Sequence, residues 1–281
     1  MNLSDINTVK SLIAKTGFEF KKSLGQNFLI NPDVCPAMAK AACDKDTGVI
    51  EIGPGIGVLT KELSKNSAKV VAIELDERLK RILPETLGDC ENTEIIYGDA
   101  MKIDLKSLIK EKFGNCKRVA VCANLPYYIT SPVIMHLLES RLPIDAVTVM
   151  VQKEAAERLC AEVGTREAGA VSVAVSYYAE PEILFGVDRK SFMPPPNVDS
   201  AVIRLKIRKE PPVALKSEKE FFKLVKCCFS QRRKTLVNAV SNTAGTDRDE
   251  LRAALRKLNL PETVRGEKLT LEQLAELSNM L

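Results

Sequence analysis

Between residues 34 and 151, short apolar segments rich in β-branched residues alternate with segments of helical periodicity. Strands that alternate with helices favour a parallel sheet covered by helices on both faces, so the pattern predicts an α/β fold. The expected strands are Val49–Ile52, Val70–Glu74, Glu94–Tyr97, Val119–Ala123 and Ala146–Val151, and the expected helices are Leu59–Ser64, Glu77–Leu83 and Leu105–Phe113.

The region after residue 151 is organised differently. Ala170–Tyr178 alternates valines with small residues like a strand, but it is also long enough for a helix. A charged linker with Pro211 and Pro212 suggests a boundary, so we expect domains at residues 1–208 and 209–281. Further strands are expected at Ile183–Val187 and Ser200–Ile207, and the second domain is predicted to be small and helical, with helices at Phe221–Phe229, Lys234–Val240, Glu250–Leu258 and Leu271–Leu281.

Composition excludes several classes of protein. With 45% apolar and 28% charged residues, the 281-residue chain has the composition of an ordinary globular protein. No apolar run approaches the roughly 20 residues that span a bilayer, and the polar N-terminus lacks a signal-peptide core, so we expect a cytoplasmic protein without a membrane partner. Eight cysteines form no Cys-x-x-Cys pair and His136 is the only histidine, so we expect no metal site.

Positive charge is concentrated in one window of the chain. Residues 202–234 contain 11 Lys or Arg but only 3 Asp or Glu, although the net charge of the whole chain is only +4. A run of this kind is most often a solvated face. It also has the composition of a phosphate-binding surface, because Lys and Arg supply most of the sequence-independent affinity for nucleic acids.

A glycine-rich loop follows the first expected strand. Its sequence is Glu51-Ile52-Gly53-Pro54-Gly55-Ile56-Gly57, and glycines at such a position let a nucleotide approach the backbone and the helix N-terminus. The second strand ends at Glu74, whose carboxylate can accept both ribose hydroxyls of an adenosine moiety. Asp99, at the end of the third strand, can either cap the next turn or accept a hydrogen bond from an adenine amino group. The combination predicts a nucleoside site at the strand ends without identifying the cofactor.

The fourth expected strand ends in Asn124-Leu125-Pro126-Tyr127, although smaller residues would suit a simple turn better. An exocyclic adenine amine is a weak nucleophile because its lone pair is delocalised into the ring. Hydrogen bonds from this amine to the Asn124 side-chain oxygen and to the carbonyl of Leu125 or Pro126 would favour a pyramidal nitrogen. Tyr127 can stack on the base, and the proline fixes the loop. The segment therefore predicts a site for an amine nucleophile.

These motifs, together with Lys22–Leu29, Ser191–Ser200 and Gln231–Thr235, resemble those of the ribosomal RNA adenine dimethyltransferase family, in particular its bacterial small-subunit members. The resemblance extends over nearly the whole chain. It implies a Rossmann-like S-adenosylmethionine-dependent methyltransferase sheet with helices on both faces, followed by a small all-α C-terminal domain. It also implies that Ala170–Tyr178 is helical.

The resemblance further implies roles for individual residues. Catalytic roles fall on Asn124, Leu125, Pro126, Tyr127 and Phe192, with the target base between Tyr127 and Phe192. Cofactor contacts fall on Asn27, Leu29, Gly53, Gly55, Glu74, Asp99 and Asn124, and RNA contacts on Arg232, Arg233 and Lys234. The implied reaction transfers methyl groups from S-adenosyl-L-methionine to N6 of two adjacent adenosines near the 3′ end of 16S rRNA, in a small ribosomal subunit or its precursor, and the enzyme is expected to be a monomer.

Three other functions share some of these features. The nearest is a 23S rRNA methyltransferase that confers antibiotic resistance, against which the Gln231–Lys234 segment argues. A non-catalytic RNA-binding factor of the same fold would not need an intact Asn124–Tyr127 motif. A nicotinamide dehydrogenase could share the glycine loop, but nothing downstream supplies an acid or base for hydride transfer. Mapping of the methylated RNA, a turnover assay and a dehydrogenase assay would separate these functions.

Overall fold

The computed structural model describes residues 1, 3–16 and 28–281, and the chain separates into two compact units. Unit 1 comprises Met1–Ala156 and Glu182–Ile207, and unit 2 comprises Glu157–Pro181 and Arg208–Leu281. The expected domain boundary between residues 208 and 209 stays a prediction. The two compact units differ from the expected domains because Glu157–Pro181 belongs with the C-terminal helices.

Unit 1 is built on a sheet whose strand order is β4-β3-β2-β5-β6-β9-β7. Strands β2 to β6 pair in parallel, and β9 pairs antiparallel with β6. The seven expected strands are all present, with limits that shift by a few residues, which confirms the α/β prediction. They are β2 (Thr47–Ile52), β3 (Lys69–Glu74), β4 (Thr93–Tyr97), β5 (Arg118–Asn124), β6 (Ala146–Gln152), β7 (Ala179–Val187) and β9 (Ser200–Ile207).

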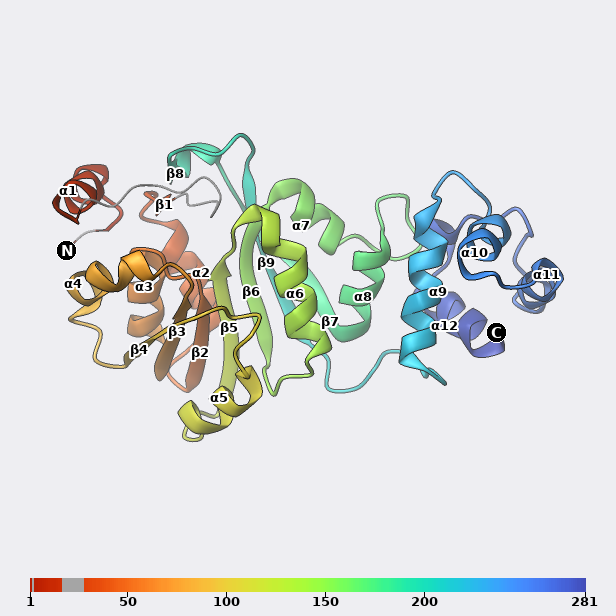
Figure 1. The fold of residues 1–281 in the computed structure, drawn as a ribbon, viewed down its shortest axis with the longest axis horizontal. Helices are drawn as coiled ribbons and strands as arrows, with labels where there is room; N and C mark the ends of the chain where they lie inside the picture. Colours follow the sequence, from red (N-terminus) through yellow and green to blue (C-terminus); the bar gives the residue numbers. More distant parts are fainter. Residues whose placement is uncertain (2, 17–27) are drawn as a thin grey trace. The chain divides into compact units, whose positions relative to one another are not determined.

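Helices cover both faces of this sheet. The chain advances from β2 to β3 in one direction and from β5 to β6 in the other, so right-handed crossovers place their helices on opposite faces. Helices α2 and α3 pack against each other, and α6 lies in front of the sheet in Figure 1. The helices are α1 (Ile6–Thr16), α2 (Val34–Ala42), α3 (Val58–Asn66), α4 (Leu83–Leu87), α5 (Leu105–Lys112) and α6 (Thr130–Glu139).

Two elements of unit 1 differ from expectation. The helix expected at Glu77–Leu83 is a 3₁₀ helix, η2 (Glu77–Arg81), followed by α4, because Pro84 favours a new helix start. Helix α1 was not predicted. It packs by the buried side chains of Val9 and Leu12 against the core.

The central strands of the sheet are buried along their length. All six residues of β2 and five of the seven residues of β5 are buried. Such continuous apolar runs are typical of parallel strands covered on both faces, and this is why the sequence pattern revealed them.

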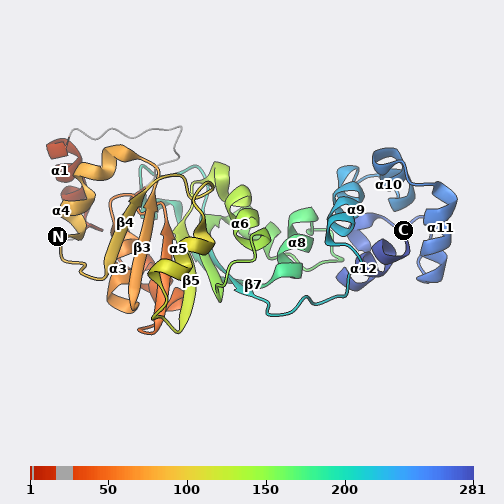
Figure 2. The same cartoon turned by 60° about the horizontal axis from the view of Figure 1, so that its bottom comes forward.

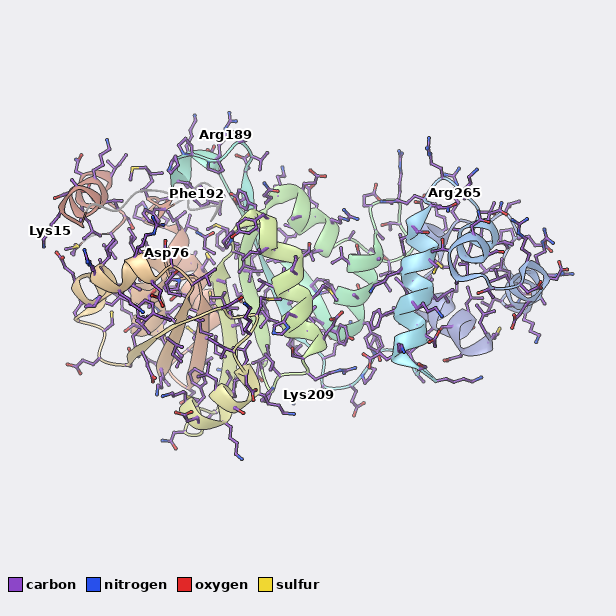
Figure 3. The ribbon with its side chains drawn as sticks, in the orientation of Figure 1. Lys15, Asp76, Arg189, Phe192, Lys209 and Arg265 are labelled. Carbon is purple, nitrogen blue, oxygen red and sulfur yellow. The ribbon has the colours of Figure 1, made fainter. Side chains whose placement is uncertain are left out.

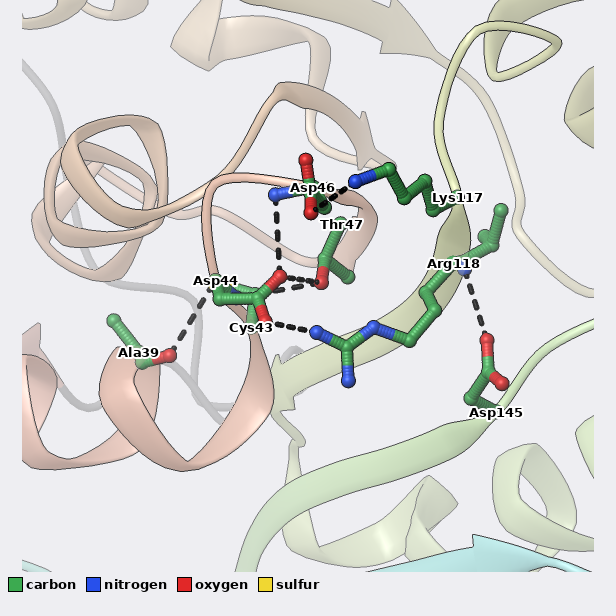
Figure 4. A network of polar contacts seen from close by, with 9 residues as sticks. Ala39, Cys43, Asp44, Asp46, Thr47, Lys117, Arg118 and Asp145 are labelled. Atoms are coloured by element: carbon green, nitrogen blue, oxygen red, sulfur yellow. Dashed lines mark hydrogen bonds and ion pairs between the residues drawn. The ribbon is translucent and has the colours of Figure 1, made fainter.

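A polar network fixes the starting ends of β2 and β5 (Figure 4). The Thr47 hydroxyl donates to Asp44 at 2.7 Å, and Asp44 also pairs with Arg118. Lys117 pairs with Asp46 at 2.8 Å. Exposed ion pairs of this kind contribute only about 0–1 kcal/mol to stability each. They lie at the register in which Thr47 is opposite Arg118.

Unit 2 is helical, and Figures 1 and 2 both show its C-terminal helices gathered together. It contains α8 (Ala170–Tyr178), α9 (Glu218–Ser230), α10 (Leu236–Ala244), α11 (Arg248–Lys257) and α12 (Leu271–Met280), while α7 (Lys153–Leu159) begins in unit 1 and ends in unit 2. The rings of Tyr178 and Phe222 stack at 5.5 Å where α8 packs on α9. None of the described helices combines the length and the apolar character needed to cross a bilayer.

Candidate active site

The carboxyl ends of β2 and β5 offer a place for a ligand. The two strands are neighbours, but their crossovers lead in opposite directions, which leaves a crevice beyond the strand ends. A cleft there encloses about 1260 Å³ of empty space, open solvent included. It is lined by ten of the predicted site residues: Leu29, Gly53, Gly55, Glu74, Asp99, Asn124, Leu125, Pro126, Tyr127 and Phe192.

The loop after β2 needs its glycines for backbone conformation. Gly53 and Gly55 have φ angles of 72° and 59°, a region in which a side chain is strained. A Cβ atom on Gly53 would meet nothing within 4 Å, so its backbone angle, not crowding, requires glycine. The loop therefore presents bare backbone to the cleft.

Glu74 connects this loop to the end of β3. Its buried carboxylate accepts hydrogen bonds from the Asp76 N–H at 2.7 Å and from the Gly55 N–H at 3.2 Å. Burial raises the pKa of Glu74, although these two donors oppose the shift. Each carboxylate oxygen can accept more than one hydrogen bond, so the held carboxylate can still bind two hydroxyl groups from the cleft.

Asp99 lies at the end of β4 and has the capping role considered for it. Its carboxylate accepts a hydrogen bond from the Met101 N–H at 3.0 Å. Leu75 and Met101 are 54% and 37% exposed, and both line the cleft beside Glu74 and Asp99. Apolar side chains next to two acids suit a flat ring with a polar edge, such as adenine. The sequence analysis missed Leu75 and Met101, although each follows a strand-end acid within two residues.

Hydrogen bonds to residues of β6 and β9 fix the segment after β5. Leu125 is buried, and its N–H donates to the Met150 carbonyl at 3.3 Å. The Tyr127 hydroxyl lies 2.7 Å from Ser200 Oγ, which fixes this half-buried ring, and burial raises the pKa of Tyr127. The Asn124 amide makes no hydrogen bond to any described residue, so both its donor and its acceptor are available to a ligand.

The structure distinguishes between the two backbone carbonyls, of Leu125 and Pro126, that were considered as acceptors for an adenine amine. The Pro126 carbonyl already accepts hydrogen bonds from the Ile129 N–H at 3.1 Å and from the Thr130 hydroxyl at 3.4 Å. A carbonyl oxygen has two lone pairs. The Leu125 carbonyl is therefore the better placed acceptor of the two.

Phe192 reaches the cleft from a distant part of the chain. It begins β8 (Phe192–Met193), which pairs antiparallel with β1 (Phe28–Leu29), so that Leu29 is its register partner. The Ile30 N–H donates to the Ser191 carbonyl at 2.8 Å and strengthens this pairing. Figure 3 shows Phe192 and Arg189 on the same loop. Phe192 is buried, and it also forms part of the cleft wall. The predicted cofactor contact Asn27 lies outside the described residues.

Glu51 is a cleft residue to which the sequence analysis gave no role. It lies in β2 just before the glycine loop and is 1% exposed, and its Oε2 atom has no hydrogen-bond partner among the described residues. Burial raises the pKa of Glu51 to about 8. A buried unpaired oxygen beside a cleft is costly unless a ligand or solvent group reaches it. The available signal was an acid inside an otherwise apolar strand.

The three predicted RNA contacts lie in unit 2, in the turn between α9 and α10. Arg232 is engaged within the unit: its guanidinium donates to the carbonyls of Arg166 and Ala168 and to Glu267, the last at 3.2 Å. Arg233 and Lys234 are exposed, and neither side chain has an ion pair with a described residue. Arg233 and Lys234 are therefore the members of the set whose charges are free to bind phosphates.

None of the eight cysteines, all of which are among the described residues, is in a disulfide. All eight are free thiols, and burial raises the pKa of Cys43 and of Cys160 to about 11. Protonated thiols are poor nucleophiles and poor metal ligands. Across the described residues, His, Cys, Asp and Glu side chains form no group of three that could hold a metal ion.

A mostly parallel sheet of this order, with a glycine loop after its first central strand and an acid at the end of its second, is a Rossmann-like arrangement, and similarity to solved structures identifies it as that of a methyltransferase. Two solved structures support this class. A dimethyladenosine transferase from Plasmodium falciparum has a TM-score of 0.73 and 27% identity, over 89% of this chain and 95% of that one. The 23S rRNA methyltransferase ErmE has a TM-score of 0.70 and 27% identity, over 91% and 99% of the two chains.

The chain belongs to the family described as Ribosomal RNA adenine dimethylase, whose sequence model matches residues 17–281. It is 48% identical to Ribosomal RNA small subunit methyltransferase A of Geobacillus thermodenitrificans, over 97% of this chain and 94% of that protein. The protein of the same name from Clostridioides difficile is 45% identical, over 99% of this chain and 96% of its own length. These findings confirm the family resemblance predicted from the motifs.

Proposed function

We propose that this protein transfers methyl groups from S-adenosylmethionine to N6 of two adjacent adenosines near the 3′ end of 16S rRNA, giving N6,N6-dimethyladenosine during small-subunit biogenesis. The observation that carries the proposal is the cleft in which Asn124 and Tyr127, from the end of β5, meet Phe192, from the β8 loop. Relatives of 45–48% identity named as small-subunit methyltransferases favour this RNA over 23S rRNA, for which the neighbour is 27% identical.

The residues of the cleft fit S-adenosylmethionine. The backbone of Gly53 and Gly55 leaves space for a ligand to approach closely, and the Glu74 carboxylate can accept the ribose hydroxyls. Leu75 and Asp99 would contact the face and the edge of the adenine. When bound, this cofactor supplies a methyl group on a positively charged sulfur, which is a strong electrophile.

The loop after β5 prepares the amine of the substrate. The Asn124 side-chain oxygen and the Leu125 carbonyl would accept the two N–H groups of the adenine amine. With both hydrogens directed to acceptors, the nitrogen lone pair is turned out of the ring plane and toward the methyl donor. Stacking of the base between Tyr127 and Phe192 fixes its position, so orientation supplies much of the rate. The extra proton can leave to water after transfer, so the cleft needs no strong base.

The basic segment of unit 2 would hold the RNA by its phosphates. Arg233 and Lys234 carry exposed charges that ion pairs within the described chain do not neutralise. Such contacts are independent of sequence and weaken with salt. Recognition of the two adenosines therefore falls to the cleft and to the shape of the ribosomal particle.

Small ribosomal subunits that lack the modification provide the test. They are incubated with the protein and with S-adenosylmethionine labelled in its methyl group, and the labelled nucleosides are identified after complete digestion of the RNA. Label in dimethyladenosine at two adjacent positions of 16S rRNA is expected. Absence of label from dimethyladenosine would refute the proposal, and label in 23S rRNA of large subunits would favour the alternative methyltransferase.

A further inference from the structure

Tyr128 is the one exposed aromatic residue in the described part of the chain. Its side chain is 55% exposed, whereas the other described tyrosines and phenylalanines are buried or half-buried. Single exposed apolar residues are common and do not by themselves indicate a function. Tyr128, however, lines the same cleft as Asn124 and Tyr127, where an RNA base has to enter.

The backbone gives the two neighbouring tyrosines different directions. Both belong to the 3₁₀ helix η3 (Tyr127–Ile129), in which three residues complete a turn and consecutive side chains lie about 120° apart. The Tyr127 ring is tied to Ser200 at 2.7 Å. The Tyr128 ring therefore cannot face the same partner, and its hydroxyl has no hydrogen bond to a described residue.

The support behind Tyr128 is rigid although the ring itself is exposed. The Ile129 N–H closes the turn onto the Pro126 carbonyl at 3.1 Å, and Thr130, which follows, is buried. A ring on a fixed backbone offers a flat apolar surface at small cost in conformational entropy. The residues suited to the cofactor, Glu74 and Asp99, come from β3 and β4, whereas Tyr128 follows β5 together with the residues suited to the amine.

We propose that the Tyr128 ring is a second stacking surface, which binds the base next to the one being methylated. This inference rests on the proposed function. The target base lies between Tyr127 and Phe192, and the neighbouring base, unstacked from it, lies on Tyr128. Tyr128 lies on one side of the cleft and binds the neighbour on that side, so the two substrate adenosines are neighbours in this sense for one of the two methylated positions. Stacking on an aromatic ring requires no particular base but is stronger for purines than for pyrimidines.

The experiment compares Tyr128→Ala and Tyr128→Phe with the natural protein in single-turnover methylation of unmodified small subunits at saturating cofactor. The enzyme concentration that gives half the maximal rate is expected to rise roughly 5- to 150-fold in Tyr128→Ala, the range that corresponds to loss of one stacked base. Tyr128→Phe should behave like the natural protein. The matched control is Ile183→Ala, an exposed apolar side chain that does not line the cleft, and it should change nothing.

A second arm links the effect to the neighbouring base. Two batches of subunits are assembled, each on 16S rRNA in which a different one of the two adenosines is replaced by uridine. In one of the two batches, the replacement should weaken methylation of the remaining adenosine by the natural protein but have little further effect on Tyr128→Ala. Calorimetry should give equal S-adenosylmethionine affinities for all variants.

The outcomes separate this inference from the proposed function. If the natural protein makes no dimethyladenosine, the function itself is wrong. If the natural protein does so and Tyr128→Ala matches it, Tyr128 is no stacking surface. Losses that are additive with Tyr128→Ala for both uridine substrates would also overturn the inference, and a loss of cofactor affinity in Tyr128→Ala would assign the ring to the cofactor instead.

Discussion

Replacing Glu74 with alanine tests the cofactor site most directly. The carboxylate lies at the end of β3 and is held by the Gly55 and Asp76 N–H groups at 3.2 and 2.7 Å. A hydrogen bond to a charged group contributes about 1.5–3 kcal/mol, and 1.36 kcal/mol corresponds to a factor of ten. Loss of one net hydrogen bond to the ribose should therefore weaken S-adenosylmethionine binding about 13- to 160-fold. The fold should survive, because Glu74 is at the edge of the core.

Calorimetric titration of S-adenosylmethionine gives the affinity, and circular dichroism shows whether the variant is folded. Glu77→Ala is the matched control, since this acid is three residues further on, is exposed and pairs with Lys80. Unchanged cofactor affinity in a folded Glu74→Ala protein would refute the assignment.

The acceptor role also has a pH signature. Burial raises the pKa of Glu74, and only the ionised carboxylate accepts both ribose hydroxyls. Cofactor affinity of the natural protein should therefore fall as the pH is lowered through this raised pKa. Glu74→Gln should bind more weakly at neutral pH and lose this part of the pH dependence, and an unaltered pH profile would contradict the argument.

Further variants test other parts of the structure. Asn124→Ala should slow methyl transfer far more than it weakens RNA binding, and near-normal single-turnover rates at saturating cofactor and RNA would show that the motif only shapes a turn. Arg233→Ala and Lys234→Ala should each weaken the dependence of RNA affinity on salt concentration, by roughly one unit of slope in a plot of log affinity against log salt per lost phosphate contact, without affecting thermal stability. Arg232→Ala should instead destabilise unit 2 by about 1–3 kcal/mol, because its hydrogen bonds within the unit are lost. The pKa of Glu51 is about 8 in the folded protein against 4.5 unperturbed, so folding favours its protonated form and stability of the natural protein falls as pH rises through this window. Glu51→Gln should lack that loss, and denaturation curves with parallel pH dependence in the two proteins would contradict this.

The central sheet could be predicted because its physics is local. Each parallel strand is an apolar run that ends in polar residues, and parallel strands end at one edge of the sheet. Glu74, Asp99 and Asn124 therefore had to lie near one another once the strands were recognised, and the structure places all three in one cleft. The Asp99 carboxylate is bonded within its own turn, whereas the Glu74 carboxylate also accepts from Gly55 in the preceding loop.

The local sequence pattern did not predict the secondary structure of a segment that is buried on most of its sides. Ala170–Tyr178 alternates valines like a strand, yet it forms helix α8 because nearly all its sides are buried, and a helix that is apolar all round needs no amphipathic stripe. Ser172 stabilises the start of helix α8, because its Oγ atom accepts a hydrogen bond from the Gly169 N–H at 2.9 Å and donates one to the Arg158 carbonyl at 2.6 Å. The family resemblance gave the helix correctly, whereas the β propensity of valine was too weak a guide.

Two pairs of adjacent residues of the same type make different contacts in the structure, and the sequence alone could not predict the difference. Arg232 and Arg233 are adjacent and chemically alike, but Glu267 and the carbonyl of Ala168, both distant in sequence, engage only Arg232 among the described contacts. Tyr127 and Tyr128 differ in the same way, because Ser200 from β9 reaches only the first ring. In each pair, residues distant in sequence engage one member, while the other has no polar side-chain partner among the described residues. No local pattern reveals which member will be engaged, because the contacts that decide it join distant parts of the chain.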